Sequence, residues 1–533
     1  MTSSPHAAPT DRIRWAGAAV LSASLFLLAS AAFILLRPLL PIDETRYLTV
    51  AWEMWLGGSK LLTRLNGEIY SHKPPLLFWL MNLVWSITGV DGFGARMIGP
   101  LFGAVSVLLT AALARALWPD APLRARNAAP MLATAGVFLL FGSLTMFDTL
   151  LTTAVLAAML ALVRLRQRPG RAGVAGLAAA LALGVFAKGP VVLVHVLPVA
   201  LLMPLWADPG ARPKAGAWYR QIGVALLIAV GLVALWLGPA LVLGGAEYRA
   251  DVLWRQSAGR MVSSFAHDRP MWFYLALMPV FLWPWGWTPA GLKALAPRRV
   301  WADESGRLLA VWSLAALLAF SVFSGKQEHY LLPELPALAL MLSAGSLAPA
   351  SGRWRRIILL VPALVIFGLA CLAASGQLSG LAAMGMTVPP ANLALGGLAF
   401  ILLAAGVWRS RSELLAVAAV APATLLLAHL LAGPALWRGF DTSGIAGELA
   451  ARESRGIAVM MPEYHGEFGF TGRLTAPVAA LVSPEEVAVW AQAHPGGIVG
   501  TAADLSGLSL GQAEARLFRG REFRLYPVPD AVP

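Results

Sequence analysis

The chain has 533 residues, of which 58% are hydrophobic and 13% charged, and its formal net charge is +13. Soluble domains are closer to about half apolar and roughly a quarter charged, so the composition excludes an ordinary soluble protein. A basic chain can bind nucleic acid, but here the arginines stand in short clusters between apolar blocks, where such clusters orient membrane spans. We therefore exclude nucleic acid as a partner.

Long apolar blocks begin near the N-terminus and recur along the chain. A helix needs about 20 such residues to cross roughly 30 Å of hydrocarbon. The blocks that are nearly free of charge include 17–36, 101–117, 224–243 and 393–407. A cleaved signal peptide is a poor interpretation of the first block, because further blocks follow and no clear small-residue cleavage site comes after it. The sequence predicts an all-α polytopic membrane protein in contact with membrane lipids.

The loop after the first span contains an apolar stretch, 76–87, that is short for a span and includes Asn82. If this stretch crossed the membrane, every later basic cluster would change sides. We interpret it as an interfacial helix on the outer surface, a depth that suits Trp79 and Trp85.

The basic clusters decide the predicted topology, because Lys and Arg are enriched in cytoplasmic connections. With the stretch 76–87 outside the hydrocarbon core, about 13 spans place every cluster on the cytoplasmic side. The clusters are Arg12/Arg14, Arg115/Arg124/Arg126, Arg164/Arg166/Arg168/Arg171, Arg212/Lys214/Arg220, Lys293/Arg298/Arg299/Arg307, Arg353/Arg355/Arg356 and Arg409/Arg411.

The last part of the chain is polar enough to fold in water. Residues 456–461 and 521–527 have the pattern of short strands, and 484–493 has that of a helix. We predict two domains: a transmembrane domain, 1–438, and a small extracytoplasmic α/β domain, 439–533.

The outer connections carry a second population of charges close to the ends of spans. Asp43 and Glu44 follow the first span, where adjacent acids could act as a base, hold a metal ion or simply begin a solvated loop. Asp148 lies between two apolar blocks and could carry chemistry, cap the next helix, or do both. The cations on the same side, together with one phenol, are Arg46, Lys73, Lys188, Arg255, Arg260, Lys326 and Tyr330.

A carboxylate and several cations near the membrane boundary suit a lipid-linked phosphate as substrate. The cations would stabilise charge on a phosphate leaving group, and the carboxylate would take a proton from the acceptor. His195 stands within an apolar block, and we interpret it as a packed or backbone-bonded side chain rather than a ligand.

An ordered set of short motifs runs from the first span to about Pro336. It comprises Asp43-Glu44, Tyr47, Glu53-Met54, Asn66-Gly67, Tyr70, Lys73-Pro74-Pro75-Leu76, Ala95-Arg96, Phe147-Asp148, Lys188-Gly189, His267 with Pro270, and Lys326 with Tyr330 to Pro333. This set resembles the polyprenyl-phosphate-dependent membrane glycosyltransferases of GT-C fold, which include protein O-mannosyltransferases and lipid A aminoarabinose transferases. The C-terminal third is similar to them only in hydropathy and layout.

The resemblance implies an inverting glycosyltransferase that moves a sugar from a polyprenyl-phosphate donor to an extracytoplasmic acceptor, either a glycolipid such as lipid A or a protein. It implies Asp43 as the base or acceptor-orienting acid. It implies that the donor phosphate is bound by Arg46, Lys73, Lys188, Arg260 and Tyr330. Some relatives hold a metal near the lysine, which implies His72 and His267 as candidate ligands of a divalent cation; no cofactor beyond that is expected.

The sequence departs from the aminoarabinose branch at His72, where that branch has an acid, and within the stretch from Lys326 to Tyr330. The sugar and the acceptor therefore stay open. The alternative is a transporter or flippase of a lipid-linked saccharide, which would be expected to show internal repeats and midplane charges. The sequence has no repeat, and its outer charges lie near one face. An enzyme of a bacterial plasma membrane, with its site and C-terminal domain outside, is the favoured hypothesis.

Overall fold

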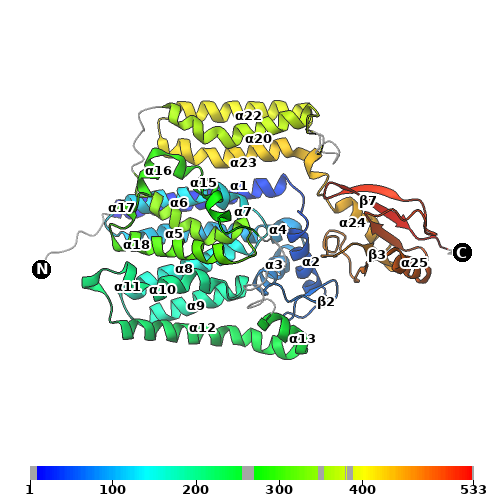
Figure 1. The fold of residues 1–533 in the computed structure, drawn as a ribbon, viewed down its shortest axis with the longest axis horizontal. Helices are drawn as coiled ribbons and strands as arrows, with labels where there is room; N and C mark the ends of the chain where they lie inside the picture. The colour runs from blue at the N-terminus through cyan, green and yellow to red at the C-terminus, as the bar shows by residue number, and fades with distance from the viewer. Residues whose placement is uncertain (1–8, 255–268, 346–352, 379, 381–387, 531–533) are drawn as a thin grey trace.

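The structure is a computed structural model of the chain. Figure 1 shows a bundle of long helices with nearly parallel axes and a smaller domain of strands and helices at one end. The short elements α2, α3 and α4 lie between the bundle and this domain. The residues that the structure describes are 9–254, 269–345, 353–378, 380 and 388–530.

Nine helices in these described ranges are long and apolar enough to cross a membrane. Helix α12 exposes Leu227, Leu235 and Val242, each at least 74% accessible, which is the pattern of a helix that faces lipid. The spans lie in α1 (Pro9–Leu35), α5 (Ile98–Leu117), α8 (Asp148–Gln167), α9 (Arg171–Lys188), α12 (Ala215–Leu243), α18 (Glu304–Val322), α20 (Val361–Ala374) with the preceding η5 (Arg353–Leu360), α22 (Pro390–Arg409) and α23 (Glu413–Trp437).

Within the described chain, four further segments consist of shorter helices in tandem. Each has a proline inside a helix, which removes a backbone donor and interrupts the helical hydrogen bonding: Pro130, Pro198, Pro279 and Pro333. Should each segment cross once, the total would equal the 13 spans predicted; that count is not confirmed and stays a prediction. The segments are α6 (Pro122–Ala133) with α7 (Gly136–Gly142), α10 (Val192–Leu201) with α11 (Met203–Trp206), α15 (Phe273–Leu282) with α16 (Pro289–Ala294), and η4 (Glu328–Glu334) with α19 (Leu335–Leu342).

Helix α8 lies at the centre of the bundle. It packs along α5 and α9, and most of its side chains are buried. Small residues allow these helices to approach closely, as in other membrane bundles. Gly173 of α9 is an example, because a Cβ added there would meet Leu165 Cδ1 of α8 at 2.8 Å.

The two ends of the bundle differ in their charges. At the end where α8 finishes, Arg166 pairs with Glu304 at 3.0 Å, and Arg307 pairs with Asp208. At the end where α8 starts, Asp148 pairs with Lys188. A helix of this length is about 30 Å long. The basic clusters around α8 and the predicted site residues therefore occupy opposite ends, as the charge pattern indicated.

The first outer loop folds into short elements: α2 (Asp43–Trp55), the hairpin β1 (Arg64–Leu65) and β2 (Glu68–Ile69), α3 (Leu76–Thr88) and α4 (Gly92–Arg96). Helix α3 has 13 residues and is too short to span. It buries Phe78, Met81 and Trp85 next to α2. The predicted short helix is confirmed, and its place at the membrane interface stays a prediction.

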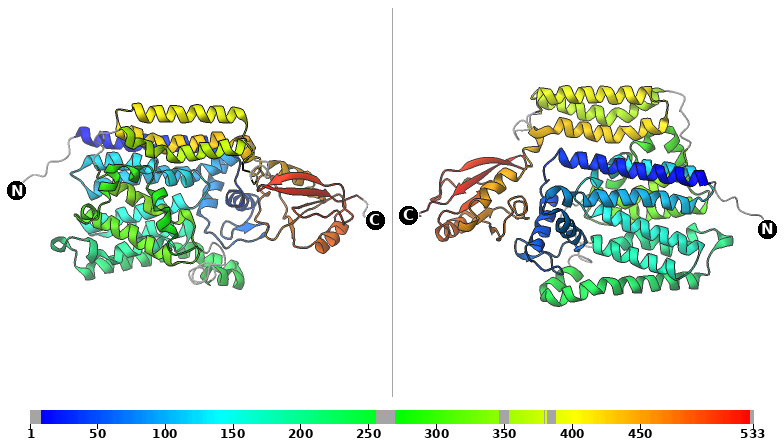
Figure 2. Two further views of the ribbon diagram at one scale, coloured as in Figure 1. Left: turned by 45° about the horizontal axis from the view of Figure 1, so that its top comes forward. Right: turned by 180° about the vertical axis from the view of Figure 1, so that it is seen from behind.

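The C-terminal domain contains α24 (Ser443–Ala450), α25 (Pro484–Ala493) and a five-stranded sheet in the order β4-β3-β5-β7-β6. Strands β4 (Ala479–Leu481), β3 (Ile457–Met460) and β5 (Ile498–Thr501) are parallel, whereas β7 (Arg521–Pro527) is antiparallel to both β5 and β6 (Glu514–Phe518). The predicted strands and helix are confirmed. Figure 2 shows this domain at the end of the bundle from two further directions; the proposed boundary at 438/439 stays a prediction.

The C-terminal domain is attached to α2 through residues 464–478, which we call the docking loop. The Thr49 hydroxyl donates to the carbonyl of Gly466 at 2.8 Å and accepts from the N–H of Phe470 at 2.9 Å. The indole of Trp52 donates to the carbonyl of Leu474 at 2.8 Å. The close contact requires a glycine at 469, where a Cβ would meet Thr49 Cγ2 at 2.5 Å.

Further contacts extend this attachment beyond α2. Asn66, in the tight turn of the hairpin, makes two hydrogen bonds of 2.8 Å with the backbone of Val478. The ring of Phe470 stacks on that of Trp85 of α3, with 5.4 Å between the ring centroids. The guanidinium of Arg473 lies over the same Phe470 ring, 3.8 Å from its centroid. The first loop and the docking loop thus form one packed unit.

Candidate active site

Asp43 is the first residue of α2, and its side chain is 45% exposed. An acid in the first helical turn is stabilised by the helix dipole. The carboxylate pairs with Arg46, and its Oδ1 accepts from the Tyr47 hydroxyl at 3.2 Å. Both recorded bonds use Oδ1, so Oδ2 has no recorded partner among the described residues and can accept a proton.

Glu44 occupies a different environment, with its side chain only 3% exposed. Arg37 binds both carboxylate oxygens, with Nη2 at 3.0 Å from Oε1, and Arg96 Nη2 lies 3.7 Å from Oε2. The backbone N–H groups of Leu40 and Thr145 donate to it at 3.1 and 2.9 Å. The carboxylate therefore ties together the end of the first span, α4 and the start of α8.

The electrostatics of Glu44 argue against a role as a base. Burial alone raises its pKa, but the charges of Arg37 and Arg96 outweigh burial and bring the pKa to about 2. A carboxylate this acidic, with both oxygens occupied, does not take a proton at neutral pH. Glu44 was predicted as a catalytic candidate; the geometry instead assigns it an anchoring role.

Asp148 and Lys188 form a buried pair, with 2.7 Å between Lys188 Nζ and Asp148 Oδ1. The side chain of Asp148 is 2% exposed and that of Lys188 is 11% exposed. Asp148 is the first residue of α8, whereas Phe147 is the N-cap and makes no side-chain cap. Of the two roles left open for Asp148, capping is therefore not supported. The carboxylate instead links the start of α8 to the end of α9, where Gly189 terminates the helix with φ +81°.

The 3-10 turn η4 adds two rings to this pair. Lys188 Nζ lies 4.9 Å above the ring of Tyr330, a cation–π contact. His329 Nε2 lies 4.0 Å from Asp148 Oδ2, and the imidazole is buried. His329 was not among the predicted site residues. Its position directly before Tyr330 in a tight turn was the available signal.

Lys73 connects the first loop to this cluster. Its Nζ lies 5.7 Å from the ring centroid of Phe147, and its charge acts on both Asp148 and His329. The charge of Asp43 also acts on His329. The structure therefore brings Asp43, Lys73, Asp148 and His329 into one neighbourhood, with Arg46 at its edge.

Lys326 does not join this group. Its side chain is buried, and its ammonium donates to the carbonyls of Arg269, at 2.8 Å, and Phe323. These hydrogen bonds stabilise the turn before η4 and direct the ammonium to backbone carbonyls. The geometry of Lys326 therefore does not support the predicted phosphate contact. The other predicted residues, Arg255, Arg260 and His267, lie outside the described residues.

Of the two proposed metal ligands, His72 lies within the described residues and His267 lies outside them. His72 is exposed, with its ring 5.2 Å from that of Tyr70. No group of three or more His, Cys, Asp or Glu side chains that could hold a metal ion occurs among the described residues. His72 therefore stays a candidate ligand on the sequence argument only.

His195 was expected to be packed or bonded to the backbone. It is packed, with its ring 5.2 Å from that of Phe320, but its Nδ1 faces the carboxyl of Glu334 at 2.6 Å. The packed interpretation is confirmed, and the hydrogen-bond partner of Nδ1 is a side chain of η4 rather than the backbone.

The site carries the cations Arg46, Lys73 and Lys188 against the carboxylates Asp43 and Asp148. A surplus of donors with positive charge, partly screened from water, binds phosphate oxygens through charge-assisted hydrogen bonds. An exposed carboxylate next to these cations can accept a proton. The arrangement can bind an anionic group and deprotonate a second molecule beside it.

The fold as a whole corresponds to a known architecture. Over 96% of this chain and 98% of the other, it matches the crystal structure of ArnT from Cupriavidus metallidurans bound to undecaprenyl phosphate, with a TM-score of 0.74 and 18% sequence identity. The apo structure of the same protein gives a TM-score of 0.72 with 16% identity. The chain is thus a polytopic membrane protein of the predicted GT-C fold.

Sequence comparisons point the same way. The dolichyl-phosphate-mannose-protein mannosyltransferase family matches residues 72–236. Undecaprenyl phosphate-α-4-amino-4-deoxy-L-arabinose arabinosyl transferases from Pseudomonas aeruginosa (strain LESB58) and Pectobacterium carotovorum are 31% and 30% identical, over 56% and 58% of this chain. The chain spans about half the length of these curated relatives, 54% and 55%. The predicted resemblance to the polyprenyl-phosphate glycosyltransferases is confirmed.

Proposed function

We propose that the chain is an inverting glycosyltransferase that takes a sugar from a polyprenyl-phosphate donor and transfers it to an extracytoplasmic acceptor, a glycolipid such as lipid A or a protein. The observation that carries the proposal is the gathering of Lys73, Lys188 and Asp43 at one end of the bundle. The undecaprenyl phosphate bound in the matching structure supports the same donor class here. The names of the similar proteins favour a pentose such as aminoarabinose.

The proposed reaction divides the work between cations and acid. Lys73, Lys188 and Arg46 hold the donor phosphate and stabilise its charge when the bond to the sugar breaks. Asp43 takes the proton from the acceptor group as this group bonds to the sugar carbon. The polyprenyl phosphate leaves, and attack opposite to it inverts the sugar carbon. Asp148 holds Lys188 in place, so its expected role is to position a cation.

Mass spectrometry of lipids and envelope proteins from cells with and without the gene tests the proposal. One lipid or protein species should lose the mass of a single sugar when the gene is removed and regain it when the gene returns. Unchanged masses, together with lost movement of a lipid-linked saccharide across the membrane, would instead identify a transporter.

Lys73→Ala should lower sugar transfer roughly ten- to hundredfold, because one charge-assisted contact to phosphate contributes about 1.5–3 kcal/mol. The matched control is Lys293→Ala, since Lys293 is an exposed lysine of α16. Transfer is measured in membranes with equal amounts of each protein. Equal transfer by parent and Lys73→Ala would contradict a phosphate-binding role.

The orientation of the site is proposed to be periplasmic, in a bacterial inner membrane. Cys371 is first replaced, and a single cysteine is then introduced at Ser324→Cys or at Arg168→Cys. In cells whose outer membrane alone is permeabilised, a thiol reagent that does not cross the inner membrane should label Ser324→Cys but not Arg168→Cys. These positions lie at opposite ends of the bundle. Labelling of Arg168→Cys alone would reverse the proposed orientation.

A further inference from the structure

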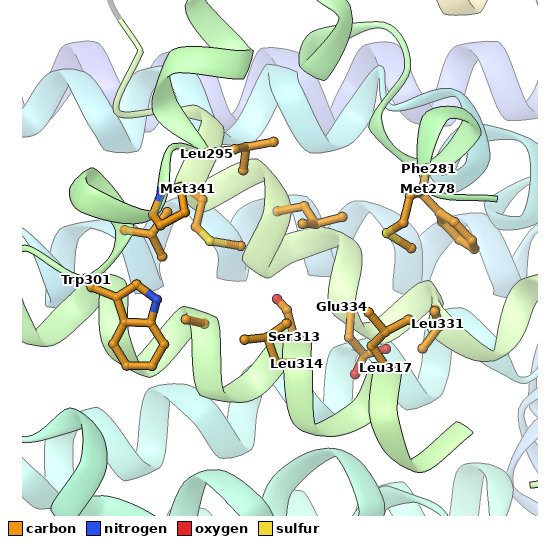
Figure 3. A pocket seen from close by; sticks show the side chains of 14 residues that line it. Met278, Phe281, Leu295, Trp301, Ser313, Leu314, Leu317, Leu331, Glu334 and Met341 are labelled. Atoms are coloured by element: carbon orange, nitrogen blue, oxygen red, sulfur yellow. The ribbon is translucent and has the colours of Figure 1, made fainter. Parts of the chain in front are cut away.

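A narrow cavity of about 280 Å³ lies inside the bundle, outside the site described above. On one side it is lined by α15, the end of α16 and α17 (Pro297–Val300). On the other side it is lined by α18, η4 and α19. Figure 3 shows that it is elongated, with Trp301 near one end and Leu331 and Phe281 near the other. We call this cavity the bundle slot. Most of its lining side chains are aliphatic or aromatic.

Two polar groups interrupt this apolar lining. Ser313 of α18 and Glu334 of η4 both face the slot (Figure 3). Glu334 is only 4% exposed; its Oε1 faces His195 Nδ1, while its Oε2 is buried without a hydrogen-bond partner among the described residues. The hydroxyl of Ser313 is likewise buried without a partner in the described structure.

A buried polar oxygen that lacks a partner is unfavourable, so the two groups indicate what the slot accepts. A pure hydrocarbon chain, such as the isoprenoid tail of the donor, would leave both oxygens unsatisfied. A phosphate or carboxylate would bring a second acidic group against Glu334 in a medium that screens charge poorly. A hydroxyl group satisfies both, because it donates and accepts.

The slot can be entered from the lipid. Trp301 and Leu314 line it and are 45% and 47% exposed on the outer surface of the bundle. Leu318, on the same helix as Leu314, is 66% exposed. Glu334 follows His329 by five residues of 3-10 helix, so it lies about 10 Å deeper than the site.

We propose that the bundle slot binds a single lipid chain that carries a hydroxyl group, with this hydroxyl bonded to Glu334 and Ser313. The chain enters between α15–α17 and α18 from the surrounding membrane. Its polar end lies toward the site, and its apolar end lies toward Met341. The slot is distinct from the donor phosphate site, and the inference holds whichever sugar the protein transfers.

Photocrosslinking tests the proposal with a pair of synthetic single-chain lipids. Both carry a diazirine at the chain end, and only one has a hydroxyl on the chain near its polar end. The full-length protein in detergent should crosslink the hydroxylated probe at Leu338 or Met341. The probe without the hydroxyl should need about tenfold higher concentration, the effect of one hydrogen bond to a buried polar group.

Variants separate the hydroxyl from the shape of the slot. Leu338→Trp should block both probes, because the larger side chain fills the cavity. Ser313→Ala should reduce the preference for the hydroxylated probe, whereas Ser321→Ala on the same helix, outside the slot lining, should leave it unchanged. Ser313 makes no recorded bond within the described structure, so Ser313→Ala is expected to fold; its melting temperature is measured alongside.

Equal crosslinking by the two probes would overturn the proposal, since the polar groups would then be satisfied by water. Crosslinks found only outside the slot would also overturn it. Polyprenyl phosphate is added as competitor: displacement of the hydroxylated probe from Leu338 would assign the slot to the donor chain instead. None of these outcomes depends on sugar transfer, so they leave the proposed function untouched.

Discussion

Asp43→Asn is expected to reduce sugar transfer by about 10²–10⁴-fold, the usual contribution of a general base. Asparagine keeps the shape of the side chain and a hydrogen bond to Tyr47, but it cannot take a proton from the acceptor. Because Asp43 is partly exposed and makes its recorded bonds through one oxygen, the variant should fold. Transfer is measured with equal amounts of purified parent and variant protein.

Donor binding provides the control for Asp43. The proposed phosphate cations Lys73 and Lys188 are unchanged in Asp43→Asn, so the affinity for a polyprenyl-phosphate sugar should stay within a few-fold of the parent. A variant that binds donor but does not transfer identifies a chemical role. Full transfer by Asp43→Asn would remove Asp43 from the mechanism, and the base would have to be sought elsewhere in the cluster.

Glu44→Gln is expected to affect folding rather than chemistry, with a loss of about 3–5 kcal/mol in the free energy of unfolding. The substitution leaves the guanidinium groups of Arg37 and Arg96 buried without a compensating charge. Thermal unfolding in detergent should show a lower melting temperature. Glu53→Gln is the matched control, since Glu53 is a less buried acid of the same helix that accepts only backbone N–H groups among the recorded bonds.

The pH dependence of stability should report the same carboxylate. The folded pKa of Glu44 is about 2, below its ordinary value of 4.5, so its ionised form stabilises the fold. This contribution is complete above about pH 4.5 and is lost as the pH falls toward 2. The parent should lose stability in this range by more than Glu44→Gln does. Parallel acid profiles for the two proteins would contradict the anchoring role.

Hydropathy and charge predicted the architecture well, because membrane spans obey strong local constraints. A backbone in lipid must satisfy its own hydrogen bonds, so long apolar blocks such as 224–243 become helices. The short stretch 76–87 was separated from the spans by its length, by Asn82 and by the positions of the later basic clusters, and it forms a helix too short to span. The strands of the C-terminal domain were predicted from alternating apolar and polar residues bounded by turn residues.

The predicted site was harder to resolve, because adjacent residues in a sequence can point into different surroundings. Asp43 and Glu44 are neighbours, yet one is exposed and the other is enclosed by Arg37, Arg96 and the backbone. Those partners come from separate segments, which no local pattern connects. Lys326 and His195 illustrate the same point, since the partners that explain them are packed against them only in the folded bundle.

The docking loop has a consequence for the synthesis of the protein. Helix α2, with Asp43 at its start, is made early, but the residues that cover it through Thr49 and Trp52 are more than 400 positions later. The first loop can reach its final packing only after the docking loop has been synthesised and folded. A chain truncated before the docking loop would therefore lack the hydrogen bonds that hold Thr49 and Trp52, and α2 would stay unsupported on that side.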